Sequence, residues 1–98
     1  MTTENIRFKW DPRKSDSNRR KHGVEFEFVT LAFFDPLKRI DIEGHEHGEI
    51  RWRAIGEVNG RLFVVSYTSR EENEIETIRI ISARKAGRRE RQEYEEAP

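Results

Sequence analysis

The stretch "IRWRAIGEVNGRLFVVSYTS" (residues 50–69) decides the fold of this chain. Asn59-Gly60 stands between two alternating runs, and this pair favours a two-residue β-hairpin because a type I′ turn needs positive φ at both central positions. Counting outward from the turn places Trp52 opposite Tyr67 at the far end. One face of the hairpin is then apolar, with Trp52, Ala54, Gly56, Phe63, Val65 and Tyr67. The other face is apolar near the turn and basic or hydroxylic at the far end, with Arg51, Arg53, Ile55, Leu62, Val64, Ser66 and Thr68.

The flanking sequence predicts an α+β fold in a single domain over residues 1–98. Residues 6–10 alternate like a short strand, and residues 12–22 form a polar helix that Asp11 caps and Gly23 ends. The apolar spacing in residues 24–34 predicts a second helix, closed by Asp35-Pro36. Residues 37–43 and 75–83 are predicted strands, residues 44–49 and 69–74 polar loops, and a last helix begins at about Arg84. This order favours an antiparallel sheet of about four strands.

Composition limits the class of protein. A chain of 98 residues has room for a small core only, and 39% charged against 34% apolar residues indicates a marginal domain that depends on a partner. The formal net charge of zero gives no global electrostatic reason to bind nucleic acid. The absence of cysteine excludes disulfides, thiol catalysis and cysteine zinc sites. Without an apolar leader or a run of about 20 apolar residues, the expected location is the cytoplasm.

A local basic surface is predicted at the far end of the hairpin. Arg51, Arg53, Ser66 and Thr68 share one face there, and the next strand adds Arg79 and Arg84. Guanidinium groups match phosphate oxygens in bidentate fashion, and the nearby rings of Trp52 and Tyr67 could stack unpaired bases. The alternative is that the arginines pair with the abundant glutamates and the aromatic rings belong to the core.

The histidines allow two interpretations each. His45 and His47 lie two residues apart in a predicted loop without a third ligand, so they are interpreted as solvated side chains and no metal site is predicted. His22, at the end of the first helix, could act as a general base or could only interact with the helix C-terminus. The sequence holds no catalytic Ser/His/Asp arrangement and no glycine-rich phosphate loop.

The closing segment "ARKAGRRERQEYEE" (residues 83–96) places cations first and carboxylates last, which opposes the helix dipole. Pairs at i,i+4 spacing, Arg89 with Glu93 and Arg91 with Glu95, are expected to return roughly 0.2–0.5 kcal/mol each. The basic start is interpreted as one wall of an RNA site. The glutamates are expected to hold that wall in solvent rather than to take part in chemistry.

Several collinear stretches together resemble the BrnT toxins: "FKWDPRK", Asn18 with "RRKHGVEF", "DPL" at 35–37, "RWRAIGEVNGRLFVVSYTSR" and "IRIISARKAGRRERQEYEE". The resemblance implies a RelE-like fold and a ribonuclease that blocks translation without a cofactor. It also implies a BrnA-like antitoxin with a ribbon-helix-helix domain, through which alone the chain would reach operator DNA. The family usually has Glu directly before "RW", where this chain has Ile50 and, one residue earlier, Glu49.

Metal-independent RNA cleavage requires removal of the 2′-hydroxyl proton, stabilisation of the phosphorane charge and protonation of the leaving 5′-oxygen. The predicted catalytic residues are His22, Arg51, Tyr67, Arg79 and Arg84. The predicted RNA-binding residues are Trp52, Arg53, Thr68, Arg70, Ser82, Lys85 and Arg88. The candidates for acid and base are His22, Tyr67, Lys21, Lys85 and Glu90, and Tyr67 as base would need arginines to lower its pKa from about 10. A non-catalytic nucleic-acid-binding or protein-interaction module remains the alternative.

Overall fold

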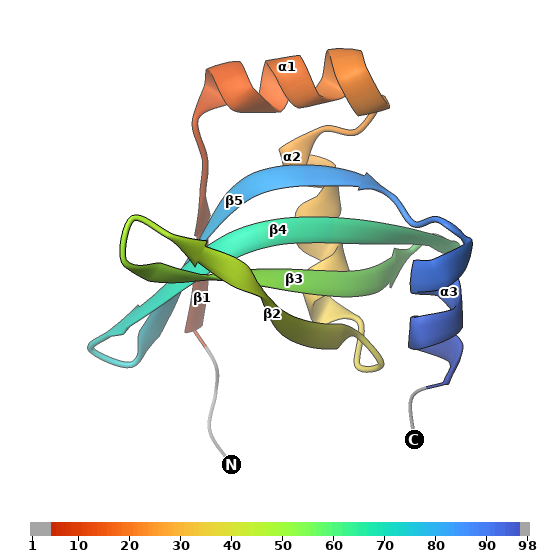
Figure 1. The fold of residues 1–98 in the computed structure, drawn as a ribbon. Helices are drawn as coiled ribbons and strands as arrows, with labels where there is room; N and C mark the ends of the chain where they lie inside the picture. The colour runs from red at the N-terminus through yellow and green to blue at the C-terminus, as the bar shows by residue number, and fades with distance from the viewer. Residues whose placement is uncertain (1–4, 97–98) are drawn as a thin grey trace.

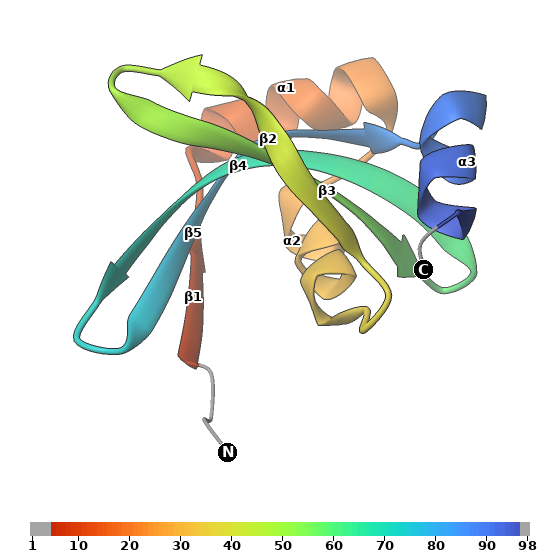
Figure 2. The same ribbon diagram turned by 60° about the horizontal axis from the view of Figure 1, so that its bottom comes forward.

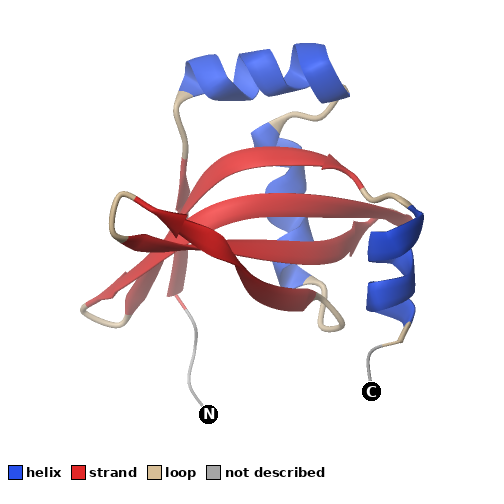
Figure 3. Ribbon diagram, viewed as in Figure 1, coloured by secondary structure: helices blue, strands red, loops and turns tan. Residues whose placement is uncertain are grey.

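The computed structural model of the chain describes residues 5–96, which form one five-stranded sheet with helices on both faces (Figures 1 and 3). The elements in chain order are β1 (Asn5–Lys9), α1 (Pro12–His22), α2 (Phe26–Val29), the 3-10 helix η1 (Thr30–Phe34), β2 (Arg39–Glu46), β3 (Glu49–Val58), β4 (Arg61–Glu72), β5 (Ile75–Lys85) and α3 (Arg88–Glu95). The predicted α+β class is confirmed. In the described range, no helix is both long and apolar enough to cross a membrane.

The sheet order is β1-β5-β4-β3-β2. Strands β2 to β5 form the predicted antiparallel meander, and β1 extends it by pairing parallel to β5. The predicted hairpin register is confirmed, because Trp52 pairs with Tyr67 and Val58 with Arg61. The ladder between β3 and β4 ends at Trp52 and Tyr67, and beyond it the β2–β3 and β4–β5 hairpins diverge as two arms (Figure 2).

The strands are longer than predicted, and the polar loops expected at 44–49 and 69–74 are wrong. Strand β2 continues to Glu46, and only His47 and Gly48, both at positive φ, separate it from β3. Asn73 and Glu74, also at positive φ, form the equivalent turn between β4 and β5. The polar residues assigned to loops belong to the hairpin arms, where most side chains are exposed.

Two helix predictions need correction. The helix predicted over 24–34 is one α-helical turn, α2, followed by η1. The last helix begins at Arg88 rather than at about Arg84, because Arg84 and Lys85 still pair with Val64 and Phe63 of β4. In contrast, α1 is as predicted: the Asp11 carboxylate accepts the Arg13 N–H at 2.9 Å, and Gly23 ends the helix at φ 71°.

The main core lies between one face of the sheet and the α2–η1 segment. Its buried residues are Val24, Phe26, Val29, Ala32, Phe33, Ala54, Val58, Phe63, Val65, Tyr67, Ile78, Ile80 and Ala83. Gly56 allows β3 to approach η1, since a Cβ there would lie 2.5 Å from the Ala32 carbonyl oxygen. On the opposite face, where α3 lies (Figure 2), Ile55, Leu62 and Val64 are buried. We call this opposite face the open face of the sheet.

Candidate functional site

The open face carries most of the predicted basic and hydroxyl side chains. Strand alternation and register place Arg51 and Arg53 of β3, Ser66, Thr68 and Arg70 of β4, and Arg79, Ser82 and Arg84 of β5 on it. Thr68 pairs with Arg79, and Ser66 pairs with Ser82. The sheet therefore gathers these predicted site residues on one surface, although they extend along the whole length of its strands.

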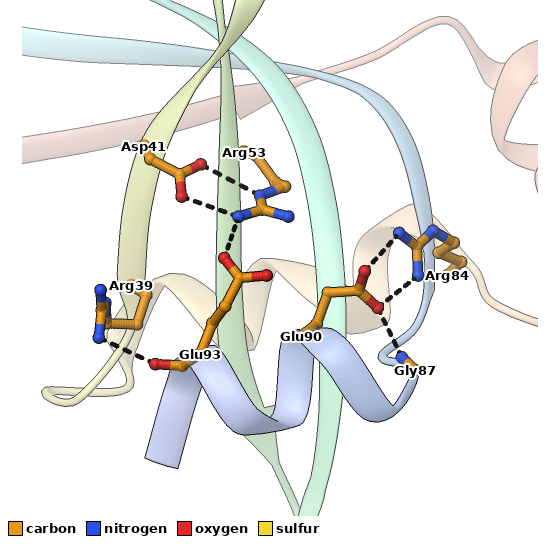
Figure 4. A network of polar contacts seen from close by, with 7 residues as sticks. All are labelled: Arg39, Asp41, Arg53, Arg84, Gly87, Glu90 and Glu93. Atoms are coloured by element: carbon orange, nitrogen blue, oxygen red, sulfur yellow. Dashed lines mark hydrogen bonds and ion pairs between the residues drawn. The ribbon is translucent and has the colours of Figure 1, made fainter. Parts of the chain in front are cut away.

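Both predicted arginines of β3 are already paired with carboxylates. Arg51 donates to Glu43 at 2.8 Å and to Glu46 at 2.7 Å. Arg53 donates to Asp41 at 2.8 Å and to Glu93 at 2.6 Å (Figure 4). The hydrogen bond from Arg53 to Asp41 is the main reason that the pKa of Arg53 is raised above its ordinary value. The alternative of arginine–carboxylate pairing therefore holds for these side chains.

Helix α3 is attached to the open face by its glutamates. Glu93 binds Arg53, so the expected pair with Arg89 does not form, and its backbone oxygen accepts from Arg39 at 2.9 Å (Figure 4). Glu90 binds Arg84 at 3.0 Å and accepts the Gly87 N–H at 2.6 Å. The prediction that the glutamates hold the helix in solvent is wrong for Glu90 and Glu93.

These contacts also explain the charge order of the segment. The hydrogen bond from Arg84 lowers the pKa of Glu90 to about 2, with further help from the Gly87 N–H. Glu90 lies in the first turn of α3, where a carboxylate suits the helix dipole. Because Arg84 and Lys85 belong to β5, the conflict between cations and the dipole is confined to Arg88 and Arg89.

A basic pocket of about 290 Å³ lies on the open face, away from α3. We use this name for the site lined by Lys9, Glu49, Thr68, Arg70, Glu72, Thr77 and Arg79. Arg70 donates to Glu49 at 3.0 Å across the two hairpin arms, which lowers the pKa of Glu49. Lys9 and Arg79 form no ion pair with any residue between 5 and 96. Their charges remain available for an anionic ligand beside the hydroxyl groups of Thr68 and Thr77.

The aromatic candidates lie on the other face. Tyr67 is 3% exposed and packs edge-on against Phe33, with ring centroids 4.9 Å apart. Burial raises the pKa of Tyr67, and the charges of Glu76 and Asp41 raise it further. The condition for Tyr67 to act as a base, that arginines lower its pKa, is therefore not met, and the phenol stays protonated at neutral pH. Trp52 is half-buried against the core.

The remaining candidates lie at the other end of the sheet. Arg79 and Lys85 are six residues apart on β5, which corresponds to roughly 20 Å along a strand. Lys85 lines a different cavity, of about 590 Å³, together with Gly23 and Phe28. Exposed Lys21 and His22 end α1, and exposed Arg88 begins α3. The structure therefore separates these four side chains from the basic pocket.

Sequence reasoning missed Lys9 and Thr77. Lys9 reaches the pocket because β1 pairs parallel to β5, with Lys9 beside Arg79 and Arg7 beside Thr77. The alternation of "IRFK" indicates that Arg7 and Lys9 share a face, yet nothing local specifies β5 as the partner. His45 lies on β2 and His47 in a turn, and residues 5–96 contain no group of three or more side chains arranged to hold a metal ion.

A family model described as "Ribonuclease toxin, BrnT, of type II toxin-antitoxin system" matches residues 10–90. This range includes β2 to β5, both helical segments of the core and the start of α3. No curated protein matches the chain at a significant level. Since the match covers most of the sequence, the chain belongs to the BrnT family and is a ribonuclease toxin of a type II toxin-antitoxin system.

Proposed function

We propose that the basic pocket is the RNA-cleaving centre of this ribonuclease toxin and that the enzyme is an endoribonuclease. The observation that carries the proposal is the presence of two cations without ion pairs, Lys9 and Arg79, beside the hydroxyl groups of Thr68 and Thr77 in one cavity. Such a cavity suits a phosphodiester, because fixed positive charge stabilises the anionic transition state and hydroxyl groups orient its oxygens.

The pocket residues also suggest how cleavage proceeds without a metal ion. Arg79 stabilises the negative charge that develops on the phosphorane. Glu49 and Glu72 are the carboxylates of the pocket, and Glu72, which unlike Glu49 is not held by an arginine, is better suited to accept the 2′-hydroxyl proton. The Lys9 ammonium is suited to donate a proton to the leaving 5′-oxygen. Of the earlier candidates, Tyr67, His22 and Lys85 do not line this pocket.

The paired arginines form a second part of the proposed RNA surface. Arg51, Arg53 and Arg84 share the open face with the pocket. Phosphate groups of a bound RNA could replace their carboxylate partners, since both anions match the guanidinium fork. We therefore assign these arginines to RNA binding outside the pocket, together with Ser82, and not to the chemical step.

Substitution of the free cations tests the assignment. Arg79→Ala and Lys9→Ala should each reduce cleavage of a 5′-labelled RNA in EDTA by about a hundredfold or more, because a charge that stabilises the transition state is lost. Arg61→Ala is the matched control, since Arg61 is exposed near the β3–β4 turn and also lacks an ion pair among the described residues. Cleavage by Arg79→Ala at the wild-type rate, in a protein with unchanged circular dichroism, would reject the assignment.

The same assay separates the enzyme from a binding module. A metal-independent ribonuclease should cut the RNA in EDTA and leave a 2′,3′-cyclic phosphate, because the 2′-oxygen is the nucleophile. RNA that is retarded in a gel but stays intact, both in EDTA and in magnesium, would indicate binding alone.

Membership of the family implies an antitoxin protein as partner. We propose that this antitoxin is BrnA-like, with a ribbon-helix-helix domain, that the toxin acts in the cytoplasm by blocking translation, and that its fold is RelE-like. If a small gene beside the toxin gene encodes a ribbon-helix-helix protein, its coexpression should restore growth of cells that produce the toxin. Continued growth arrest with a stable ribbon-helix-helix protein present would contradict the proposed partner.

A further inference from the structure

The face of the sheet opposite the basic pocket carries a second cavity, of about 440 Å³, with acidic and aromatic walls. Its lining is Ile40, Trp52, Tyr67, Ser69, Glu71 and Glu76. We call it the acidic cavity. Alternation along β4 and β5 places Tyr67, Ser69, Glu71 and Glu76 on one side of these strands, and Thr68, Arg70, Thr77 and Arg79 of the basic pocket on the other. The same two strands therefore carry two sites of opposite charge.

Two features indicate that the acidic cavity receives a cation. Glu71 and Glu76 are direct cross-strand partners on one face, an arrangement that is destabilising unless a positive charge neutralises it. No lysine or arginine is among the residues that line the cavity. The same carboxylates would repel RNA phosphates, so this cavity does not suit the substrate.

The Tyr67 hydroxyl is also available to a ligand in this cavity. Tyr67 is 97% buried and lines the cavity, and its hydroxyl makes no hydrogen bond within residues 5–96. Trp52, directly opposite Tyr67 in the ladder, presents an aromatic ring beside the carboxylates. A guanidinium or ammonium group in this position would meet two carboxylates, a phenol oxygen and an indole ring.

An exposed apolar surface adjoins the cavity. Ile40, Ile42 and Phe34 are 45%, 57% and 62% exposed. Ile42 is the cross-strand neighbour of Trp52, and Phe34 contacts Phe8 in the aromatic cluster that includes Phe33 and Tyr67. Exposed apolar side chains around a charged anchor site are typical of protein–protein interfaces.

We propose that the acidic cavity binds a lysine or arginine side chain of the antitoxin, whose neighbouring apolar residues cover Ile40, Ile42 and Phe34. The inference rests on the proposed function for its partner, but it names a surface separate from the RNA site. A single basic side chain that is buried between carboxylates and aromatic rings is the kind of anchor that dominates interface energetics.

Charge reversal in the cavity tests the proposal. Glu71→Lys should raise the Kd for the purified antitoxin, measured by isothermal titration calorimetry, at least tenfold. Glu74→Lys is the matched control, because it makes the same charge change on the same hairpin outside the cavity, and its Kd should stay within twofold of wild type. A basic residue of the antitoxin changed to glutamate should restore affinity for Glu71→Lys.

Other outcomes would overturn the proposal. One is an equal antitoxin affinity for wild type and Glu71→Lys. Another is that the wild-type protein forms a homodimer, and Glu71→Lys is monomeric but binds the antitoxin with unchanged affinity. Ribonuclease activity is measured separately on both proteins and should be equal. If the wild-type protein leaves RNA intact, the proposed RNA-cleaving function is rejected, whereas the result for antitoxin binding still tests the acidic cavity.

Discussion

Asn18 joins three parts of the chain through one buried side chain. Its amide group donates to the backbone oxygens of Val24 at 2.9 Å and Ala83 at 2.8 Å, and its oxygen accepts the Ala83 N–H at 3.1 Å. The side chain thus ties α1 to β5 and to the start of the α2 segment. A single asparagine in a polar helix gives no signal of this role, because the partner Ala83 is 65 residues away.

Replacement of Asn18 should lower the stability of the folded protein. Asn18→Ala leaves buried backbone groups of Val24 and Ala83 without partners, so we expect a loss of about 3 kcal/mol in the free energy of unfolding by urea. Ser17→Ala, on the exposed side of the same helix, should change it by less than about 0.5 kcal/mol. Equal stability of the two variants would show that water replaces the hydrogen bonds of Asn18.

Gly56 and Gly44 allow a second comparison of matched substitutions. A Cβ at Gly56 would lie 2.5 Å from the Ala32 carbonyl oxygen and 2.9 Å from its Cβ, whereas one at Gly44 meets nothing within 4 Å. Gly56→Ala should therefore lower the free energy of unfolding by roughly 1–3 kcal/mol through overpacking. Gly44→Ala should leave it nearly unchanged. Similar midpoints in urea for both variants would mean that η1 is not fixed against β3.

Among the helices, strands and turns, those with a local sequence signal could be predicted. Asn59-Gly60 specifies its own turn geometry, so the register of β3 and β4 follows from counting. His47-Gly48 and Asn73-Glu74 lack the Asn-Gly signature, and Glu rarely adopts positive φ, so the two other tight turns were missed. The boundary between β5 and α3 depends on pairing with β4, which the helix-forming residues after Ala83 do not reveal.

The ion pair that attaches α3 to the sheet should make the stability of this helix depend on pH. Because Glu90 has a pKa of about 2 in the folded protein and an ordinary value of 4.5, its ion pair with Arg84 stabilises the helix fully above pH 4.5. This contribution is lost as the pH falls from 4.5 towards 2. Carbon-13 NMR of the Glu90 carboxyl group, together with the Gly87 amide shift, should report the transition.

Removal of Arg84, the ion-pair partner of Glu90, should shift the Glu90 titration to a higher pH. Arg84→Ala takes away the largest cause of the shift, so the carboxyl group should titrate nearer to 4.5 and α3 should detach at a higher pH. Arg88→Ala is the control, because Arg88 forms no ion pair among the described residues. A Glu90 titration that is the same in Arg84→Ala and wild type would show that the Gly87 N–H alone sets the pKa.

Across the whole molecule, a net charge of zero conceals two faces of opposite character. The sequence placed the arginines and hydroxyl groups on one face, yet it did not reveal which arginines are neutralised, since Arg53 and Glu93 are 40 residues apart. Nor does the sequence indicate that β1, the strand that supplies Lys9, pairs with β5. Side-chain alternation is a local property, whereas the distribution of free charge depends on the complete fold.

The salt dependence of RNA binding follows from that distribution. With Lys9, Arg70 and Arg79 in the pocket and three arginines outside it (Arg51, Arg53 and Arg84) as the phosphate contacts, log K should fall against log salt with a slope of roughly −4 for a single strand. Fluorescence anisotropy with a 2′-O-methyl RNA measures this without cleavage, because the nucleophile is blocked. Arg79→Gln should reduce the magnitude of the slope by about 0.7, whereas Arg61→Gln should not change it. A wild-type slope of only about −2 would contradict the RNA-binding role of Arg51, Arg53 and Arg84 and would mean that these arginines keep their carboxylate partners.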